Sequence, residues 1–354
     1  MLTAGSIKQH AREMGFDLCG IAPAAALPEL AYLREWLASG YAGEMTYLHK
    51  SAEARSDIRG FLPSARSVIV TGTVYYAGEE RSTNDEGSPG LDAIAVARYA
   101  RGDDYHIVLA ERLEALVAWM RAEQPERFDA AIFVDKHHVQ ERVFARHAGL
   151  GWIGKNSCLI NPELGSWLFL AGVATSLAIE PDAPGVDQCG SCTLCIDACP
   201  TGALVDPHVL DATKCISYLT IELAGPIPEG QRASIGTHAY GCDICQDVCP
   251  WNLAPPRTSD PAFQPRARDG ASAVALWLQS DQHLHQFVTG SAMTHLSLAG
   301  LRRNLATVVG NSGDPSLVAA LDRPGHGVRN AAHSAHTPVV EEAVAWAKRR
   351  VSEV

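Results

Sequence analysis

The chain has 354 residues, enough for two or three domains, and its 47% apolar content is typical of a globular protein. No run of about 18 apolar residues occurs and residues 1–16 lack the apolar core of an export signal, so we expect a cytoplasmic protein with no membrane partner. The net charge of −11 argues against indiscriminate binding of nucleic acid, although residues 266–354 hold nine Lys or Arg against seven Asp or Glu and do not forbid a local contact.

The first 180 residues predict an alternation of helices and strands. Apolar residues recur with helical spacing over residues 105–123, and a β-branched run at 67–76 predicts a buried strand. A second apolar strand ends at Asp135. We therefore expect an α/β domain over residues 1–180, with helices at 6–14, 27–38, 105–123 and 136–148, strands at 67–76 and before 135, and extended chain over 156–179.

Eight of the ten cysteines lie between residues 189 and 250. The first four have the C-x2-C-x2-C-x3-C-P spacing of bacterial ferredoxins, in which the fourth cysteine binds the other cluster. The second run lacks its opening cysteine, and Cys215 completes the eight thiolates that two 4Fe-4S clusters need. The spacing predicts one cluster on Cys189, Cys192, Cys195 and Cys249, and another on Cys199, Cys215, Cys242 and Cys245.

Structural zinc and disulfides are the alternatives for these cysteines. Zinc ligands usually form two separated pairs, often with histidine, whereas a triplet spaced by two residues and closed by Cys-Pro is typical of iron–sulfur sites. Disulfides need an oxidising compartment, to which nothing in the N-terminal residues directs the chain. The pattern therefore favours two iron–sulfur clusters, which together form a path for electrons.

Two linkers rich in Pro and Asp flank the cysteine-rich segment, which we expect to be a domain over residues 181–260. Short amphipathic helices separated by Gly, Asn or Pro follow over residues 261–354. Their similar lengths are typical of stacked helical repeats, and an ordinary helical cap on the cluster domain is the alternative.

Several other residues are candidates for a site. The glycines of GLGWIGKN at 149–156 spell G-x-G-x-x-G but follow a helix, so a dinucleotide site is rejected. Asp135 ends a strand and is either a general acid or the N-cap of the next helix, and the residues alone favour the N-cap. His137 and His138 are interpreted as packed or exposed histidines, and Cys19 and Cys158 as small buried thiols.

Five segments together resemble the epoxyqueuosine reductase family and cover most of the chain. They are RYARGDDYH at 98–106, FVDKHHVQERVFARHAGLGWIGKNSCLINPELGSWLFL at 133–170, CGSCTLCIDACPTGAL at 189–204, KCISYLTIEL at 214–223 and YGCDICQDVCPWN at 240–252. The cysteine runs alone would fit many ferredoxin-like proteins. Their combination with CISYLTIE and AGLGWIGKN is specific to this family.

The resemblance implies a fold, an activity and partners. It implies a nitroreductase-like α/β cobalamin-binding domain at 1–180, a two-cluster ferredoxin domain at 181–260 and HEAT-like helices at 261–354. The implied reaction is reduction of epoxyqueuosine to queuosine at the wobble position of a tRNA anticodon loop, with electrons passing from the two clusters to cobalamin. The implied enzyme is a monomer that receives electrons from an external one-electron donor such as a flavodoxin or ferredoxin.

The resemblance also implies roles for particular residues. Asp135 matches the proton donor of the family, which reverses the preference for an N-cap, and we expect it to stay protonated near neutral pH in a desolvated site. The expected cofactor contacts are Asp135, Arg55, Arg98, Tyr105, His106, Gly154, Lys155, Asn156 and Ser217. The expected substrate contacts are Thr220, Glu222, Arg302, Arg303 and Arg329, and a solvated helix face is the alternative for these arginines.

One stretch departs from the family pattern, and two other functions compete. Residues 136–140 (KHHVQ) stand where the family has small residues, a proline and an aliphatic residue, so His137 or His138 could add a titratable group or a cobalt ligand. The first rival is a corrinoid reductase of small molecules, similar to reductive dehalogenases. The second is a non-catalytic ferredoxin-type electron carrier, which would leave the first 180 residues unexplained.

Overall fold

The computed structural model describes residues 2–78, 90–266, 268–323 and 337–352. Its N-terminal part is built on a four-stranded sheet in which every neighbouring pair is antiparallel. Strand β2 is buried along its whole length, as its continuous β-branched sequence predicts. The strand order is β1 (Leu18–Pro23), β2 (Ser67–Val74), β7 (Leu168–Thr175) and β4 (Ala130–Phe133).

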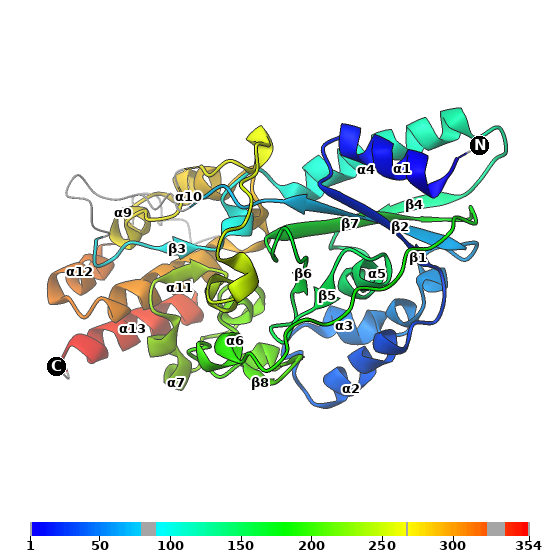
Figure 1. The fold of residues 1–354 in the computed structure, drawn as a ribbon. Coiled ribbons are helices and arrows are strands. Elements are labelled where there is room, and N and C mark those ends of the chain that lie inside the picture. Colours follow the sequence, from blue (N-terminus) through cyan, green and yellow to red (C-terminus); the bar gives the residue numbers. More distant parts are fainter. Residues whose placement is uncertain (1, 79–89, 267, 324–336, 353–354) are drawn as a thin grey trace.

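Helices cover both faces of this sheet (Figure 1). Successive residues of β2 point to opposite faces: Ile69 joins one hydrophobic core, while Val68 and Val70 join the other. The first core includes α1 (Ala4–Glu13) and α4 (Tyr105–Glu123). The other face is covered by α5 (Glu141–His147), with α2 (Tyr32–Ala38) and α3 (Thr46–Ser51) beyond it.

Most predicted elements of this part occur, and one helix was predicted too long. Helix α4 has the predicted bounds, while the predicted helix at 27–38 is a short 3-10 turn (Pro28–Ala31) followed by α2. The helix predicted over 136–148 begins only at Glu141. Residues 136–140 form a loop instead, in which the side chains of His137 and Gln140 bind backbone groups of other segments.

The cysteine-rich segment forms short elements around two similar loops. Each cysteine run encloses one turn of helix, α6 (Leu194–Asp197) in the first and α8 (Ile244–Asp247) in the second, and these two turns are in contact. A π-helix, η6 (Tyr218–Glu222), follows Cys215. The small strands and the remaining helix outside the central sheet are β5 (Trp152–Ile153), β6 (Leu159–Ile160), β8 (Leu204–Asp206), β9 (Val209–Leu210), α7 (Glu229–Arg232) and β10 (His238–Tyr240).

The C-terminal helices gather around α11 (Leu298–Asn311), in which every residue from Gly300 to Gly310 is buried. The surrounding helices are α9 (Ala273–Trp277), α10 (Asp281–Val288), α12 (Pro315–Ala319) and α13 (Pro338–Ser352). Residues 94–100 also belong to this core, and β3 (Ala95–Val96) pairs in parallel with β10. Part of the predicted N-terminal unit is therefore packed into the C-terminal one. Among the described helices, none has the length and apolar character needed to cross a bilayer.

Candidate active site and cluster-binding loops

A pocket on the cysteine-rich segment is lined by four thiols. Cys189, Cys192 and Cys195 come from the first run, and Cys249 is the last cysteine of the second run. This is the grouping that the spacing predicts for one cluster, and four thiols around one pocket suit a 4Fe-4S cluster. The indole of Trp152 donates a hydrogen bond to the Cys189 sulfur over 3.4 Å. Hydrogen bonds of this kind tune the reduction potential of a bound cluster.

The other four cysteines form a second group. Burial raises the pKa of the Cys242 thiol to about 12, and nearby Cys215 and Cys199 add to the rise. The hydrogen bond with the Cys158 thiol, followed by burial, raises the pKa of Cys245 well above its usual range, and the nearby thiols of Cys242 and Cys215 add to the rise. Four clustered cysteines in a buried setting fit a second 4Fe-4S cluster, which would take them as thiolates.

The GKN segment holds both cysteine loops in place. The Lys155 ammonium donates hydrogen bonds to the carbonyls of Gly190 (2.7 Å) and Cys192 (3.0 Å) in the first loop. The Asn156 amide donates to the carbonyl of Cys245 in the second loop over 3.3 Å. These two residues were expected to contact cobalamin, and their described contacts are with the cluster loops instead. A role toward cobalamin stays a prediction for them.

Gly154 and Ser217 each lie next to residues of the cysteine-binding region. A Cβ on Gly154 would come within 2.4 Å of the end of the Ile160 side chain, which lines the cysteine pocket. Ser217 is next to Cys215 in space, and hydrogen bonds from Ser217 lower the pKa of that thiol against a larger rise caused by burial. Their predicted contacts with cobalamin remain predictions.

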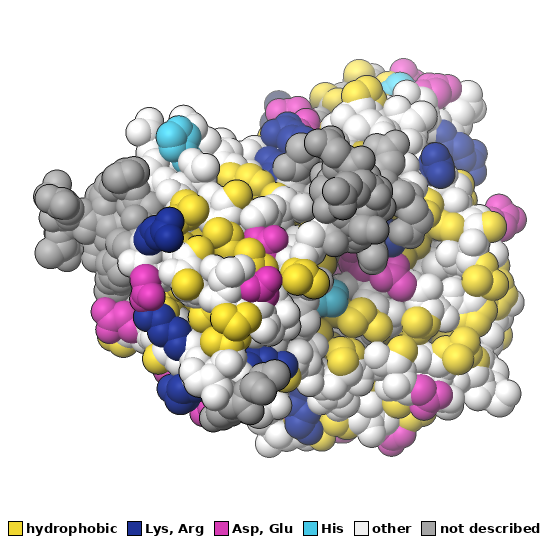
Figure 2. Space-filling model, turned by 90° about the vertical axis from the view of Figure 1, so that its left-hand side faces the viewer, with side chains coloured by type: hydrophobic (Ala, Val, Ile, Leu, Met, Phe, Trp, Pro, Cys, Tyr) yellow, Lys and Arg dark blue, Asp and Glu magenta, His cyan; other side chains and the backbone are white. Residues whose placement is uncertain are grey.

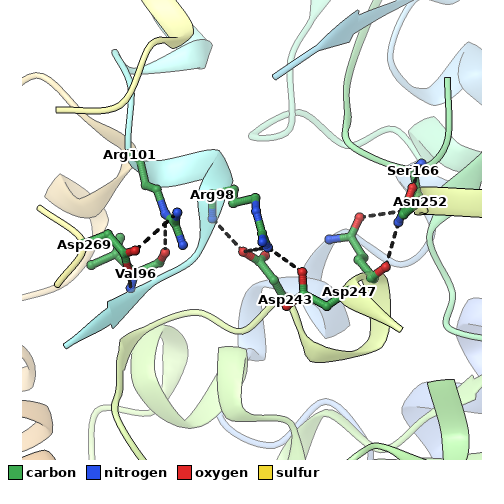
Figure 3. A network of polar contacts seen from close by, with 9 residues as sticks. Val96, Arg98, Arg101, Ser166, Asp243, Asp247, Asn252 and Asp269 are labelled. Atoms are coloured by element: carbon green, nitrogen blue, oxygen red, sulfur yellow. Dashed lines mark hydrogen bonds and ion pairs between the residues drawn. The ribbon is translucent and has the colours of Figure 1, made fainter. Parts of the chain in front are cut away.

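Arg98 joins the N-terminal part to the second cysteine loop (Figure 3). Its Nη1 lies 3.3 Å from a carboxylate oxygen of Asp243 and 2.6 Å from one of Asp247, and its backbone N–H donates to Asp243 over 2.8 Å. The guanidinium stacks over Trp167 at 4.6 Å. Both carboxylates lie within the second cysteine run, so the described contacts of Arg98 orient the cluster loop, and its expected contact with cobalamin stays a prediction.

Asp135 lies two residues beyond β4, and its carboxylate faces the start of α4. The Tyr105 hydroxyl donates a hydrogen bond to it over 3.0 Å, and Nε2 of His106 lies 3.2 Å from the same oxygen. The other ring nitrogen of His106 lies 2.7 Å from Asp104, the N-cap of α4. The structure thus brings together three residues that the sequence analysis singled out and adds Asp104, forming a carboxylate–imidazole–carboxylate array.

The charge state of Asp135 differs from the expectation. Burial acts to raise its pKa, but the hydrogen bond and charge of His106, with smaller contributions from Tyr105 and Arg142, outweigh burial and lower the pKa below its usual value. Its side chain is also 59% exposed, so water solvates the anion. The prediction that Asp135 itself stays protonated near neutral pH is therefore wrong for this arrangement.

The protons are held by two neighbours of Asp135. Burial alone would lower the pKa of His106. The hydrogen bonds and charges of Asp104 and Asp135 together outweigh burial, so the pKa of His106 is raised. Glu141 lies beneath Asp135, and burial together with the Asp135 charge raises the pKa of Glu141 to about 8. At neutral pH, the site therefore combines a carboxylate with a readily protonated imidazole and a neutral carboxyl group.

Residues from three other parts of the chain lie near Asp135. Burial raises the pKa of Tyr47 on α3 to about 12, and the charges of Glu222 and Asp135 add to the rise. Nε2 of His295 lies 3.3 Å from Glu222, and the pKa of His295 is raised chiefly by that hydrogen bond. The sequence analysis predicted Glu222 but missed Tyr47 and His295, because an isolated tyrosine or histidine carries no spacing signal.

Arg55 lies on the same side of the molecule and is half-buried. Its guanidinium donates to the Ser51 hydroxyl over 2.9 Å and to the Val139 carbonyl over 3.2 Å. Burial lowers its pKa, against the opposing charges of Tyr47, Glu141 and Asp135. Arg55 thus supports the loop that carries Asp135, and its predicted contact with cobalamin stays a prediction.

The structure contradicts three of the expected substrate contacts. Arg302 is 2% exposed and binds the carbonyls of Trp277 and Gln279, and Arg303 is 1% exposed and binds three carbonyls near the π-helix. The hydroxyl of Thr220 is bound to Ile216 inside the core. Side chains with these internal partners cannot reach tRNA phosphates. Arg329 lies outside the described residues.

Fold and site together define an iron–sulfur oxidoreductase with two cluster loops beside an α/β unit that carries an acid–base array. A family model described as a 4Fe-4S double cluster binding domain matches residues 188–252, and one described as epoxyqueuosine reductase QueG, DUF1730, matches residues 55–136. A relative from Xanthomonas campestris named epoxyqueuosine reductase is 39% identical over 97% of this chain and 95% of its own. One from Gloeobacter violaceus with the same name is 42% identical over 88% and 97%.

Solved structures agree with these relatives. A crystal structure of an epoxyqueuosine reductase with an epoxyqueuosine-modified tRNA-Tyr stem loop has a TM-score of 0.87 and 28% identity, covering 98% of this chain and 89% of that chain. The Streptococcus thermophilus enzyme has a TM-score of 0.85 and 26% identity over 99% and 90%. The chain belongs to the epoxyqueuosine reductase family.

Proposed function

We propose that this protein reduces epoxyqueuosine to queuosine at the wobble position of tRNA. The observation that carries the proposal is the Asp104, His106 and Asp135 array, which occurs together with two cysteine groups suited to 4Fe-4S clusters in a chain of this family. Removing the epoxide oxygen as water and leaving a double bond consumes two electrons and two protons. The site therefore needs an electron path and a proton donor side by side, and the molecule offers both.

A large cofactor fits the open side of this site. The side chain of Asp135 is 59% exposed and that of Tyr47 is 48% exposed, although groups from three parts of the chain surround them. We infer that cobalamin binds here, with Tyr47, Asp135 and Glu222 against it and with Arg55 and Ser217 nearby. When bound, cobalamin supplies a reducible cobalt centre that transfers electrons to the substrate.

The protein's own residues direct the two protons, the first from His106 and the second after water has reprotonated the same ring. His106 carries a proton on Nε2 toward Asp135, and Asp104 fixes the ring by accepting from Nδ1. This arrangement lets the imidazolium pass its proton to Asp135, which then delivers it to the departing oxygen. Asp135 acts as the final donor although it rests as a carboxylate, because His106 replenishes it. The Tyr105 hydroxyl keeps the carboxylate oriented.

The loop that carries Asp135 is proposed to move during the reaction cycle. A structure of the Bacillus subtilis epoxyqueuosine reductase, with a TM-score of 0.86 and 28% identity over 98% of this chain and 90% of that chain, is described with its catalytic aspartate loop swung out of the active site. We infer an inward and an outward position for the corresponding loop here. The structure described above has the inward position, with Asp135 against Tyr105 and His106.

The tRNA partner is inferred from the related complex with a tRNA stem loop. On the face shown in Figure 2, Lys and Arg side chains alternate with acidic ones and do not form one continuous patch. We infer that phosphate contacts on this face are scattered and that the modified base binds near Asp135, close to the paired Glu222 and His295. Arg302 and Arg303 stabilise the fold behind it.

The finer architecture follows the same proposal. We assign a nitroreductase-like N-terminal domain, a two-cluster ferredoxin domain and HEAT-like C-terminal helices, with residues 94–100 crossing into the last of these cores. A flavodoxin-like or ferredoxin-like protein is the proposed electron donor, a monomer the proposed state and the cytoplasm the proposed location. The proposed boundaries at residues 180 and 260 give only the order of the three domains along the chain, because residues near 94–100 pack in the C-terminal core.

The proposed reaction is tested with the purified protein loaded with iron and cobalamin. Epoxyqueuosine-containing tRNA is incubated with a chemical reductant, and its nucleosides are analysed by mass spectrometry. We expect queuosine to form only when cobalamin is present, and a bromophenol offered instead should stay intact. Unchanged epoxyqueuosine with a fully loaded protein would refute the proposal. Release of bromide would support the small-molecule reductase instead.

A further inference from the structure

The backbone of Asp135 adopts a conformation that needs support. Its φ angle is +48°, in the left-handed region that side-chain-bearing residues rarely occupy. Pairing of β4 with β7 ends at Phe133, so the sheet does not hold the residues that follow. A residue in this conformation persists only when its surroundings fix it. The groups that bind residues 134 and 135 therefore determine where the carboxylate points.

One side chain from the following loop and one from the first residue of α5 bind these backbone groups. The Val134 N–H donates to Nδ1 of His137 over 3.1 Å, and the Asp135 N–H donates to a carboxyl oxygen of Glu141 over 2.6 Å. The two bonds fix the two consecutive peptide groups that precede the Asp135 Cα, and the Lys136 N–H closes the turn after it by donating to the Val134 carbonyl over 2.5 Å. They leave the Asp135 side chain turned toward Tyr105 and His106.

The imidazole of His137 is itself held in position. Its ring packs edge-on against Phe61, with centroids 5.5 Å apart and planes at 72°. Phe61 in turn packs edge-on against Phe133 at the end of β4. This packing restricts the ring to the orientation that presents Nδ1 to the Val134 N–H. Nδ1 must be the unprotonated nitrogen, because a protonated one cannot accept.

The far end of the loop is anchored to other elements. The amide of Gln140 donates to the carbonyls of Leu30 and Arg55, both over 3.0 Å, and Arg55 donates to the Val139 carbonyl over 3.2 Å. These anchors do not involve the Asp135 backbone. Movement of Asp135 thus requires release of the bonds made by His137 and Glu141 as well as those from Tyr105 and His106, but not of the anchors at residues 139 and 140.

We propose that His137 and Glu141 are positioning residues that together latch the Asp135 loop in its inward, reactive position. The inference rests on the proposed role of Asp135 as the final proton donor. His137 is the residue special to this loop, because neutral imidazole supplies an acceptor where an aliphatic side chain or proline would supply none. The latch sets the fraction of time that Asp135 spends beside His106, and it leaves tRNA affinity unaffected.

Hydrogen exchange of the loaded protein measures the latch directly. In the wild-type protein, the Val134 and Asp135 amides should exchange slowly, because both are bonded. His137→Ala should speed exchange at Val134 about tenfold and speed it at Asp135 as well, with cluster and corrin absorbance unchanged. Equal protection of Val134 in wild type and His137→Ala would overturn the proposal.

Two replacements of the same residue test whether the acceptor matters. Asparagine places its side-chain oxygen close to the position of Nδ1, whereas the longer glutamine places its amide near Nε2. We therefore expect His137→Asn to restore protection at Val134 and His137→Gln to resemble His137→Ala. His138→Ala is the matched control, since the His138 side chain is exposed, and it should behave as wild type. Loss of protection in His137→Asn and His138→Ala alike would indicate a merely structural loop.

The kinetic readout separates the latch from the chemistry. His137→Ala should lower kcat about fivefold with KM for tRNA unchanged, the scale of one uncharged hydrogen bond. Asp135→Asn tests the proposed role of Asp135 separately from the latch. Full activity of that variant would refute this role, and the hydrogen-exchange result for His137→Ala would be unaffected. Unchanged kcat in His137→Ala despite fast exchange at Val134 would refute the latch and leave the role of Asp135 intact.

Discussion

At the scale of single residues, the site depends on which of three neighbouring acids and bases carries a proton. Asp135 is a carboxylate because His106 and Tyr105 bind it, whereas Glu141 is buried below it and keeps its proton to about pH 8. Protonated Glu141 can still accept the Asp135 N–H through its carbonyl oxygen. The same pair of carboxyl groups thus provides one anion and one neutral support.

The raised pKa of Glu141 predicts a loss of stability as the pH rises from about 4.5 to about 8. The folded-state pKa of Glu141 lies above the usual value of 4.5. The stability that protonated Glu141 contributes to the folded state is therefore fully present below about pH 4.5 and is lost as the pH rises toward about 8. Across that window, wild type should lose up to about 1.4 kcal/mol per pH unit relative to Glu141→Gln, which cannot ionise. Urea denaturation at several pH values measures this, and parallel curves for the two proteins would contradict it.

The sequence predicted part of this arrangement. Asp135, Tyr105 and His106 lie in segments that resemble the family, and the strand and helix carrying them were predicted closely. The protonation pattern was not predictable, because it depends on the distance from His106 to Asp135 and on the burial of Glu141 across the loop. His295 and Tyr47 were missed for the same reason: they reach the site only through the tertiary fold.

At the scale of elements, the π-helix η6 connects a cluster ligand to the active site. It begins three residues after Cys215 and ends at Glu222, which pairs with His295. Arg303 on α11 holds it by donating to the carbonyls of Leu219, Leu223 and Gly225 over 2.6–2.7 Å. Burial lowers the pKa of Arg303 to about 10, so the guanidinium remains charged at neutral pH.

Replacing Arg303 should destabilise the molecule strongly. Arg303→Met leaves three carbonyls without their charged donor, for an expected loss of about 3–5 kcal/mol in the free energy of unfolding. Circular dichroism during urea denaturation measures the loss, and the visible absorbance of the clusters should fade at lower urea. The control Arg349→Met removes an ion pair whose arginine is 52% exposed and should cost less than about 1 kcal/mol. Equal stability of the two variants would contradict a structural role for Arg303.

The predictions of helix bounds and of exposed arginines failed where polar side chains make specific tertiary contacts that apolar periodicity does not reveal. The pattern of residues 136–148 suggested one helix, but the side chains of His137 and Gln140 bind backbone groups of other segments, and α5 starts at Glu141. Arg302 and Arg303 were interpreted as surface groups because their charge suggested exposure. Eleven consecutive buried residues on α11 could not be inferred from a sequence with this polar content.

At the scale of the whole molecule, crossed cysteine loops join segments that are far apart in the chain. Cys249 shares a pocket with the first run, while Arg98 from the N-terminal part pairs with Asp243 and Asp247 in the second. The order and approximate extent of the three parts follow from composition and cysteine spacing. Their interlocking through residues 94–100 does not, because a two-residue strand such as β3 carries too little pattern.

The crossed arrangement predicts which cysteine variants resemble each other. Cys249→Ala should lose the same cluster as Cys189→Ala, and Cys199→Ala the same cluster as Cys242→Ala, although Cys199 belongs to the first run. Iron content should fall to about half in all four variants, as expected when one of two equal clusters is lost. The electron paramagnetic resonance signal of the remaining reduced cluster identifies it. A spectrum of Cys199→Ala that matches Cys189→Ala would indicate uncrossed ligation.

The most direct test of the central claim is nucleoside analysis of tRNA from a bacterial strain that lacks its own epoxyqueuosine reductase and expresses this chain. The account predicts that the wild-type chain converts accumulated epoxyqueuosine to queuosine, while Asp135→Asn, at equal protein level and with both clusters retained, leaves epoxyqueuosine in place. Persistent epoxyqueuosine with the wild-type chain, or full conversion with Asp135→Asn, would contradict it.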